Sequence, residues 1–284
     1  MSKSSFYENK LGLYIIPSLI GMSLFYFVPA LISVYHAFTD VAGRFVFLAN
    51  FIDIITNSVF QLALRNTVLF IIASVLVTMA FAFMLASLLQ RLRYKKALAM
   101  IFMIPLVIPS GATVFFWQVI FGDNGFINRL LFLRGMETTF WFATNWTFLI
   151  VLLVFAVRHI GFNLILFMAG YSLIPNEYYE IARLEGAGAF AIFRKVTFVY
   201  MMNTTFFVLV ISIVNSFRIF RETYLLFGQH PHRSVYFLQN FMNAQFLSAN
   251  MQRLSTTAFM ISVGVMVMVW GIFTSRRRIA KIYN

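Results

Sequence analysis

Long apolar segments separated by short polar ones dominate the pattern along the chain. Each apolar segment has roughly the 20 residues that an α-helix needs to cross the hydrocarbon core of a bilayer. The pattern therefore predicts an all-α membrane protein with about six transmembrane helices, at residues 11–38, 64–90, 97–121, 146–173, 196–217 and 255–274.

Two of the predicted spans contain prolines. The first span includes Pro17 and Pro29, and the third includes Pro105 and Pro109. Proline is tolerated in membrane helices where neighbouring groups satisfy the freed carbonyls, and it often bends the helix. We therefore expect bends in the first and third spans.

The composition agrees with a bilayer environment. The chain is 61% hydrophobic and 11% charged, with a mean hydropathy of +0.84, whereas soluble domains are about 45–50% apolar and about 25% charged. A compact soluble domain would lack the polar residues to cover its own surface. Because the chain contains no cysteine, disulfides, thiol catalysis and cysteine-based metal sites are excluded.

The N-terminus, residues 1–10, is polar and leads into a span that is too long for the core of a signal peptide. No small-residue cleavage site follows it. We therefore expect the first span to remain as a helix.

The net charge of +13 reflects topology. Nucleic-acid binding is not expected, since it needs basic residues on a solvated face, and here they lie between apolar spans. Thirteen of the 22 Lys and Arg residues fall at 3–10, 91–96, 183–195 and 276–281; eight fall on the opposite side, and Arg158 lies inside a span. The basic excess belongs in the cytoplasm, so both termini are expected there.

The segment 175–195 is long for a cytoplasmic loop. Its start, from Pro175 to Leu184, alternates charged and apolar residues and predicts a short amphipathic helix. Gly186 and Gly188 then end that helix, because glycine readily adopts a positive φ. On physical grounds alone, this helix either docks on a cytoplasmic partner or lies on the lipid headgroups.

The same segment resembles the coupling loop of ABC-transporter permeases, the membrane subunits of binding-protein-dependent importers. That loop has the pattern Glu-Ala-Ala, three residues, Gly, nine residues and Ile-x-Leu-Pro; here Glu180, Ala182 and Gly186 fall at the same spacing. Ile181 stands for the first alanine, Val196 for the isoleucine, and 198–199 is Phe-Val. The resemblance implies ATPase coupling through Tyr179, Glu180, Ala182 and Gly186.

A second region extends the resemblance to nearly the whole chain. Pro105 and Pro109, followed by Trp117, Phe121, Gly125 and Asn128, resemble the carbohydrate-uptake branch of the family, and within it the larger maltose-type permease. The resemblance implies a type I ABC importer permease fold with a cytoplasmic coupling helix, as a single transmembrane permease domain over residues 1–284 in a bacterial cytoplasmic membrane.

The resemblance also implies the partners. They are a second permease subunit, two ATP-binding subunits and an extracellular solute-binding protein, besides membrane lipid. The chain has no glycine-rich phosphate loop ending in Gly-Lys-Ser/Thr, so we expect ATP to be bound and hydrolysed on partner subunits. No cofactor, no metal and no catalytic residue is expected in this chain.

Polar residues within the spans are candidates for a solute pathway, because buried ionisable groups are costly in a membrane and usually face a cavity or a partner. The fourth span contains Arg158, His159 and Asn163; the fifth contains Ser212, Asn215 and Ser216 on one helical face. The alternative is that these groups bridge helices, which suits a lone serine or asparagine better than Arg158.

Alignment through the coupling loop adds positions that match sugar-contacting residues of the maltose-type permease; only Ser212 keeps the polar type, which suggests a different ligand. These positions are Phe155, Arg158, His159, Phe162, Ser212, Ser216 and Ile219. The predicted solute pathway comprises Phe155, Arg158, His159, Phe162, Ser212, Asn215 and Ser216.

Three other functions stay open. The same fold would carry a phosphorylated polyol or a peptide instead of a sugar, and Arg158 would suit an anion. A secondary transporter or channel would need coupling carboxylates at mid-membrane, and the sequence predicts none of the nine Asp and Glu residues there; Glu222 follows the fifth span near its outer end. A membrane enzyme would need acid, base or metal groups; His230 and His232 fit a surface loop that contacts the delivery protein better than a metal site.

Overall fold

The structure is a computed structural model that describes residues 14–90 and 92–283, with side chains as far as Ser275 except where residues are omitted. The polar N-terminus, the first residues of the predicted first span, Arg91 and the side chains of Arg276 to Arg278 therefore lie outside the described part. Within it, the regular elements are helices, and the one β-bridge joins Thr39 to Phe45.

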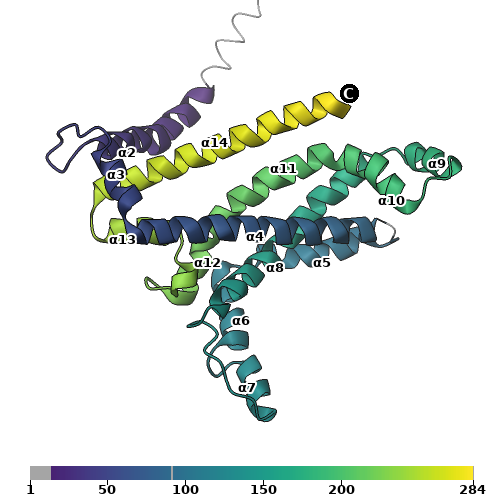
Figure 1. Cartoon of the computed structure of the whole chain (residues 1–284), viewed down its shortest axis with the longest axis horizontal. Coiled ribbons are helices and arrows are strands. Elements are labelled where there is room, and N and C mark those ends of the chain that lie inside the picture. The colour runs from purple at the N-terminus through teal and green to yellow at the C-terminus, as the bar shows by residue number, and fades with distance from the viewer. Residues whose placement is uncertain (1–13, 91, 284) are drawn as a thin grey trace, which may run out of the picture. The chain divides into compact units, whose positions relative to one another are not determined.

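The helices follow one another along the chain without an intervening sheet (Figure 1). Their bounds are η1 Ser23–Phe27, α2 Val28–Phe38, α3 Ala49–Thr56, α4 Ser58–Leu89, α5 Lys95–Val107, α6 Ser110–Phe121, α7 Phe126–Leu133, α8 Trp146–Ser172, α9 Asn176–Leu184, α10 Ala189–Ile192, η2 Phe193–Thr197, α11 Phe198–Ser216, η3 Phe217–Ile219, α12 Phe220–Phe227, η4 Arg233–Val235, α13 Leu238–Leu247 and α14 Met251–Tyr283.

The apolar segments of the sequence are helices of membrane-spanning length. Among the described residues, five helical stretches are long and apolar enough to cross a bilayer: Tyr14–Phe38, Ser58–Leu89, Trp146–Ser172, Ala189–Phe227 and Met251–Ser275. A bent pair of helices supplies a sixth if it is counted as one span. The prediction of an all-α protein with about six spans is confirmed. The fifth stretch extends well beyond the expected residues 196–217.

The third predicted span, 97–121, is two helices instead of one. Lys95–Val107 and Ser110–Leu133 meet at an angle of 93°, and Figure 1 shows α6 and α7 turned away from α5. The break follows from Pro109, because the ring of a proline disfavours the helical conformation of the residue before it. Ile108, the residue before Pro109, is accordingly extended, with ψ of 130°. Pro105, by contrast, is accommodated inside α5.

The contacts divide the chain into two compact units. The first unit comprises residues up to Gln61 together with Phe241–Met268. Its polar contacts include the Nδ2 of Asn50, which donates to the carbonyls of Ala37 and Thr39, both at 3.0 Å. Arg253 also forms a two-bonded ion pair with Asp53, at 2.8 and 3.0 Å. The Asn50 bonds join α3 to the end of α2, and the ion pair joins α3 to α14, 200 positions further along the chain.

The second unit comprises residues 62–240 and the end of the chain from Val269. Its core forms where α8 packs against α5 and α11. Gly161 permits the closest approach, since a Cβ at this position would collide with the backbone carbonyl of Phe102 in α5. This glycine therefore sets the distance between α5 and α8, and with it the position of the break that follows α5.

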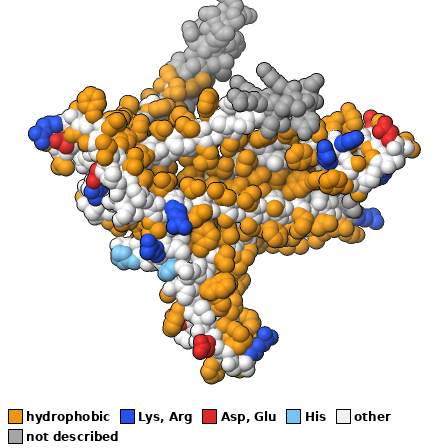
Figure 2. All heavy atoms as spheres, in the orientation of Figure 1, with side chains coloured by type: hydrophobic (Ala, Val, Ile, Leu, Met, Phe, Trp, Pro, Cys, Tyr) orange, Lys and Arg blue, Asp and Glu red, His pale blue; other side chains and the backbone are white. Residues whose placement is uncertain are grey.

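The surface of the long helices is apolar, unlike that of a soluble protein. On α4, Leu69, Ile72 and Leu76 are exposed while Ser74 and Thr78 are buried. Figure 2 shows apolar side chains over the long helices and most charged side chains near helix ends and loops. A surface of this kind suits contact with lipid, whose tails impose no cost on exposed leucine.

The region that follows Trp117, α7 and the loop after it, forms an arm that the side chain of Asn128 holds together. The Oδ1 of Asn128 in α7 accepts bonds from the indole Nε1 of Trp141 at 2.9 Å and from the backbone N–H of Thr139 at 3.1 Å. Its Nδ2 donates to the Thr139 carbonyl at 2.9 Å. One buried amide thus fixes the loop that leads from α7 into α8.

Candidate functional site

A buried ion pair joins α8 to α12 in the second unit. The guanidinium Nη1 of Arg158 lies 3.1 Å from Oε1 of Glu222, and the two side chains are only 14% and 9% exposed. The same Nη1 donates to Oγ of Ser110 at 3.1 Å, and that hydroxyl donates to Oε1 of Glu222 at 3.0 Å. The three residues form a closed triangle of charge-assisted bonds, which are stronger than neutral ones.

Each corner of the triangle depends on local backbone structure. Ser110 is the first residue of α6, directly after the break at Pro109. Arg158 lies near the middle of α8. Glu222 lies in the first turn of α12, where a carboxylate is favoured by the helix dipole. The 93° break is therefore what brings the Ser110 hydroxyl to the ion pair.

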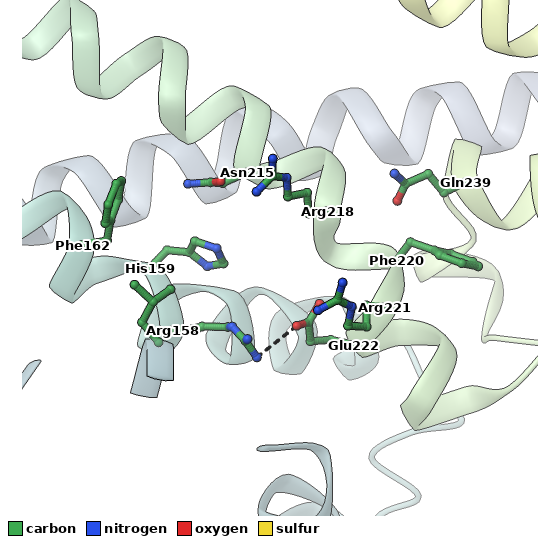
Figure 3. A pocket seen from close by; sticks show the side chains of 10 residues that line it. Arg158, His159, Phe162, Asn215, Arg218, Phe220, Arg221, Glu222 and Gln239 are labelled. Carbon is green, nitrogen blue, oxygen red and sulfur yellow. Dashed lines mark ion pairs between the residues drawn. The ribbon is translucent and has the colours of Figure 1, made fainter. Parts of the chain in front are cut away.

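Beside the triangle lies a cavity of about 600 Å³ (Figure 3). Helices α5, α8, α11, η3, α12 and α13 contribute to its wall. The lining residues are Leu106, Arg158, His159, Phe162, Asn215, Arg218, Phe220, Arg221, Glu222 and Gln239. The volume is in the range of about 300–1,000 Å³ that is typical of small-molecule sites.

Four of the predicted pathway residues line this cavity: Arg158, His159, Phe162 and Asn215. His159 is oriented by its Nδ1, which lies 3.0 Å from the carbonyl oxygen of Phe155. Because a carbonyl only accepts, Nδ1 carries the proton in this bond. The other ring nitrogen is then left for a partner in the cavity. Figure 3 shows His159 and Asn215 facing each other across the space.

The other three predicted pathway residues lie between helices. Phe155 is buried and stacks on the ring of His159, with centroids 4.0 Å apart. Ser212 accepts a bond from Nδ2 of Asn163 at 2.9 Å, and the hydroxyls of Ser216 and Ser74 are 2.9 Å apart. Ser212 and Ser216 thus join α11 to α8 and α4, as the alternative of helix bridging describes, whereas Phe155 packs against the cavity residue His159.

Several lining residues have no counterpart in the sequence prediction. Glu222 lies within the apolar helical stretch that ends at Phe227, not beyond it as the sequence suggested, because the fifth span is longer than expected. A cation inside a span needs a counter-charge, and that requirement was the available signal for Glu222. Nothing in the sequence pattern identified Ser110, Arg218, Arg221 or Gln239.

The segment expected to couple to an ATPase has the predicted form. α9 spans Asn176–Leu184, and Gly186 adopts φ of +77°, the conformation that ends a helix at low cost only for glycine. Glu180 is exposed, as is Leu184. The hydroxyl of Tyr179 lies 3.2 Å from Oγ1 of Thr197 and so ties α9 to the start of the next long helix.

The described residues contain no group of three or more His, Cys, Asp or Glu side chains arranged to hold a metal ion. His232 instead caps the short helix η4, where its Nδ1 accepts from the backbone N–H of Ser234 at 3.3 Å.

Residues 79–282 match a family model described as binding-protein-dependent transport system inner membrane component. Among curated proteins, a probable ABC transporter permease protein, YesP of Bacillus subtilis (strain 168), is 29% identical over 75% of this chain and 72% of its own length. The arabinooligosaccharides transport system permease protein AraP of the same organism is 28% identical over 81% of this chain and 76% of its own.

Among solved structures, a chain of a bacterial ABC transporter involved in the import of the acidic polysaccharide alginate superposes with a TM-score of 0.85. The two chains are 20% identical, and the match covers 98% of each. This likeness concerns the fold.

Proposed function

The chain belongs to the family of binding-protein-dependent transport system inner membrane components, and from that premise we propose that its solute is a carbohydrate, a sugar or short oligosaccharide. A member of this family is a multi-pass membrane permease, not an enzyme, and it works with a solute-binding protein and other subunits. The carbohydrate reading draws on the AraP relative and on the chemistry of the cavity.

The single observation that carries the proposal is the cavity of about 600 Å³. His159, Asn215 and Gln239 offer groups that hydrogen-bond to hydroxyls, and Phe162 and Phe220 offer rings that can stack on the C–H face of a sugar. Small-molecule sites combine apolar walls with a few placed polar groups in this way. Phe155, Ser212 and Ser216 support the wall from behind.

The proposed assembly is a second permease, two ATP-binding subunits that bind and hydrolyse ATP, and an extracellular solute-binding protein. The chain serves as one permease domain over residues 1–284, with both termini cytoplasmic. α9 docks on an ATP-binding subunit through Glu180 and its neighbours Tyr179 and Ala182, and Gly186 supplies the turn that follows. Closure of the ATP-binding subunits moves α9, and rocking of the helix bundle opens the cavity alternately to the two sides of the membrane.

The test fills the cavity with a large side chain. In proteoliposomes holding the assembled importer, its binding protein and ATP, we expect uptake of a labelled saccharide that Asn215→Trp abolishes while ATP hydrolysis persists. The matched control is Val214→Trp, the neighbouring residue in α11, which is exposed outside the cavity wall and should leave uptake unchanged.

Uptake of arabinose oligosaccharides, other sugar oligomers and monosaccharides is measured side by side with a peptide and with glycerol phosphate. Import of a peptide or of glycerol phosphate, with no saccharide imported, would replace the carbohydrate reading by one of the other solute classes. Equal loss of uptake in both tryptophan variants would remove the cavity from the pathway.

A further inference from the structure

We propose that the solute carries an acidic group, a carboxylate or a phosphate, and that Arg218 and Arg221 bind it. This inference rests on the proposed function, because it names the class of solute for the same cavity. It assigns to Arg158 a different task from the one that its position in a membrane helix first suggests.

Arg158 is already neutralised within the chain. Its Nη1 lies 3.1 Å from the carboxylate of Glu222 and donates to Ser110. A guanidinium held by a buried carboxylate and a hydroxyl has lost most of its attraction for a second anion. Arg158 therefore serves to hold α6, α8 and α12 in place around the cavity.

Arg218 and Arg221 stand in a different situation. They lie three residues apart on consecutive helical turns of η3 and α12, and both line the cavity. Within the described part of the chain, neither forms an ion pair or a hydrogen bond through its side chain. In the view of Figure 3, the guanidinium group of Arg218 is drawn next to Asn215 and that of Arg221 next to Glu222.

The charges around the cavity therefore do not cancel. Three guanidinium groups face one carboxylate, which leaves an excess of two positive charges without counting His159. Cations within an apolar helical stretch are costly unless an anion or water reaches them. Because Arg218 and Arg221 line the same space as Asn215, Gln239 and the phenylalanine rings, a single solute can meet all of these groups at once.

An acidic saccharide matches both parts of this wall. Its hydroxyls suit the amide groups, and its ring faces suit Phe162 and Phe220. Its carboxylate or phosphate suits the two arginines, because the planar guanidinium group binds either anion through two parallel bonds. A neutral saccharide would satisfy the amides but would leave two cations facing it. The cavity is thus built to favour the acidic form.

The experiment measures binding to the assembled importer in nanodiscs without its binding protein, so that delivery does not filter the result. Saturation-transfer NMR compares digalacturonate, galactose 1-phosphate and the neutral galactobiose. We expect at least one acidic probe to bind more tightly than galactobiose, by roughly tenfold or more, as befits bonds between charged groups. Its binding should weaken as salt rises from about 0.05 M to about 0.5 M.

The variant Arg218→Gln/Arg221→Gln should lose that preference, and Arg134→Gln, which removes an exposed arginine at the end of α7, should keep it. A preference for digalacturonate indicates a carboxylate solute, and a preference for galactose 1-phosphate a phosphorylated one. The proposal is overturned if galactobiose binds as tightly as both acidic probes, or if the double variant retains the preference. Either result would overturn the acidic solute but not the proposal of a carbohydrate permease, which the uptake experiment tests separately.

Discussion

At the scale of single residues, the protein keeps a cation inside an apolar helix by bringing its counter-ion from another helix. Arg158 and Glu222 are 64 positions apart in the numbering, yet their charged atoms lie 3.1 Å apart. Ser110 completes the pair by donating to the carboxylate and accepting from the guanidinium. Removing one charge of such a pair lowers the stability of the fold far more than removing both, because it leaves the other charge buried and unpaired.

A double-mutant cycle follows from this arrangement. We expect Glu222→Leu alone to lower the free energy of unfolding by about 3–5 kcal/mol, and Arg158→Met/Glu222→Leu to recover most of that loss. Denaturation in detergent, followed by tryptophan fluorescence, measures both. Arg44→Gln is the control, since Arg44 pairs with Asp40 at an exposed site and such pairs contribute little. Simple additivity of the two changes would contradict the coupling.

Gly161 gives a second prediction at this scale. A Cβ on Gly161 would collide with the carbonyl of Phe102, so Gly161→Ala must separate α5 from α8. We expect a loss of about 1–3 kcal/mol, as for overpacking, together with reduced uptake, because the break after α5 would shift. Gly271→Ala on α14 meets no atom within 4 Å and should be neutral. A Gly161→Ala protein as stable as the parent would show that the helices separate without cost.

At the scale of elements, two places where the long helices end or bend position the polar side chains. The break between α5 and α6 places a polar helix start beside the buried ion pair. At the coupling segment, a helix of nine residues followed by Gly186 with φ of +77° projects exposed side chains. The first feature interrupts an apolar stretch, and the second lies between two of them, Trp146–Ser172 and Ala189–Phe227.

The coupling segment is tested by changing its charge and its turn. We expect Glu180→Lys or Gly186→Val to abolish stimulation of ATP hydrolysis by the loaded binding protein, and uptake with it, because the first reverses a charge on the docking face and the second strains a left-handed turn. Gly188→Ala is the control, since Gly188 has φ of −69° and open space around it. Normal stimulation and uptake in both test variants would exclude α9 as the docking element.

At the scale of the whole molecule, the distribution of basic residues predicts the orientation of the chain in the membrane. The runs 91–96 and 276–281 and the coupling segment hold the basic excess, which favours the cytoplasmic side. On this prediction, the arm formed by α7 and its loop faces outward, where we propose that a solute-binding protein delivers its cargo. The two sides of the membrane would then have different partners.

Tags report this orientation directly. A tag after Arg93 or after Arg278 should be reached by protease or label only when cells are opened, whereas a tag at Asn124, in the turn between α6 and α7, should be reached in intact cells. The reason is the excess of Lys and Arg in the first two regions. Labelling of the Arg93 tag in intact cells would invert the topology.

Much of this architecture can be predicted from the sequence. The all-helical fold, the apolar spans and the short helix at 176–184 follow from the length and periodicity of apolar segments, because a bilayer requires long helices with every backbone group bonded internally. The spacing of Glu180, Ala182 and Gly186 indicated the family, and the cost of a buried cation pointed to Arg158 and His159 in the cavity wall.

Only the tertiary structure decided how the polar residues are used. The sequence spacing puts Ser212, Asn215 and Ser216 on one face of the helix. In the structure, Ser212 bonds to Asn163 and Ser216 to Ser74, while Asn215 lines the cavity. The partners of Arg158 come from helices 48 and 64 positions away. Periodicity within one helix predicts which residues share a face. Which other helix contacts that face depends on packing between segments that are distant in the chain, and a local sequence pattern does not specify that packing.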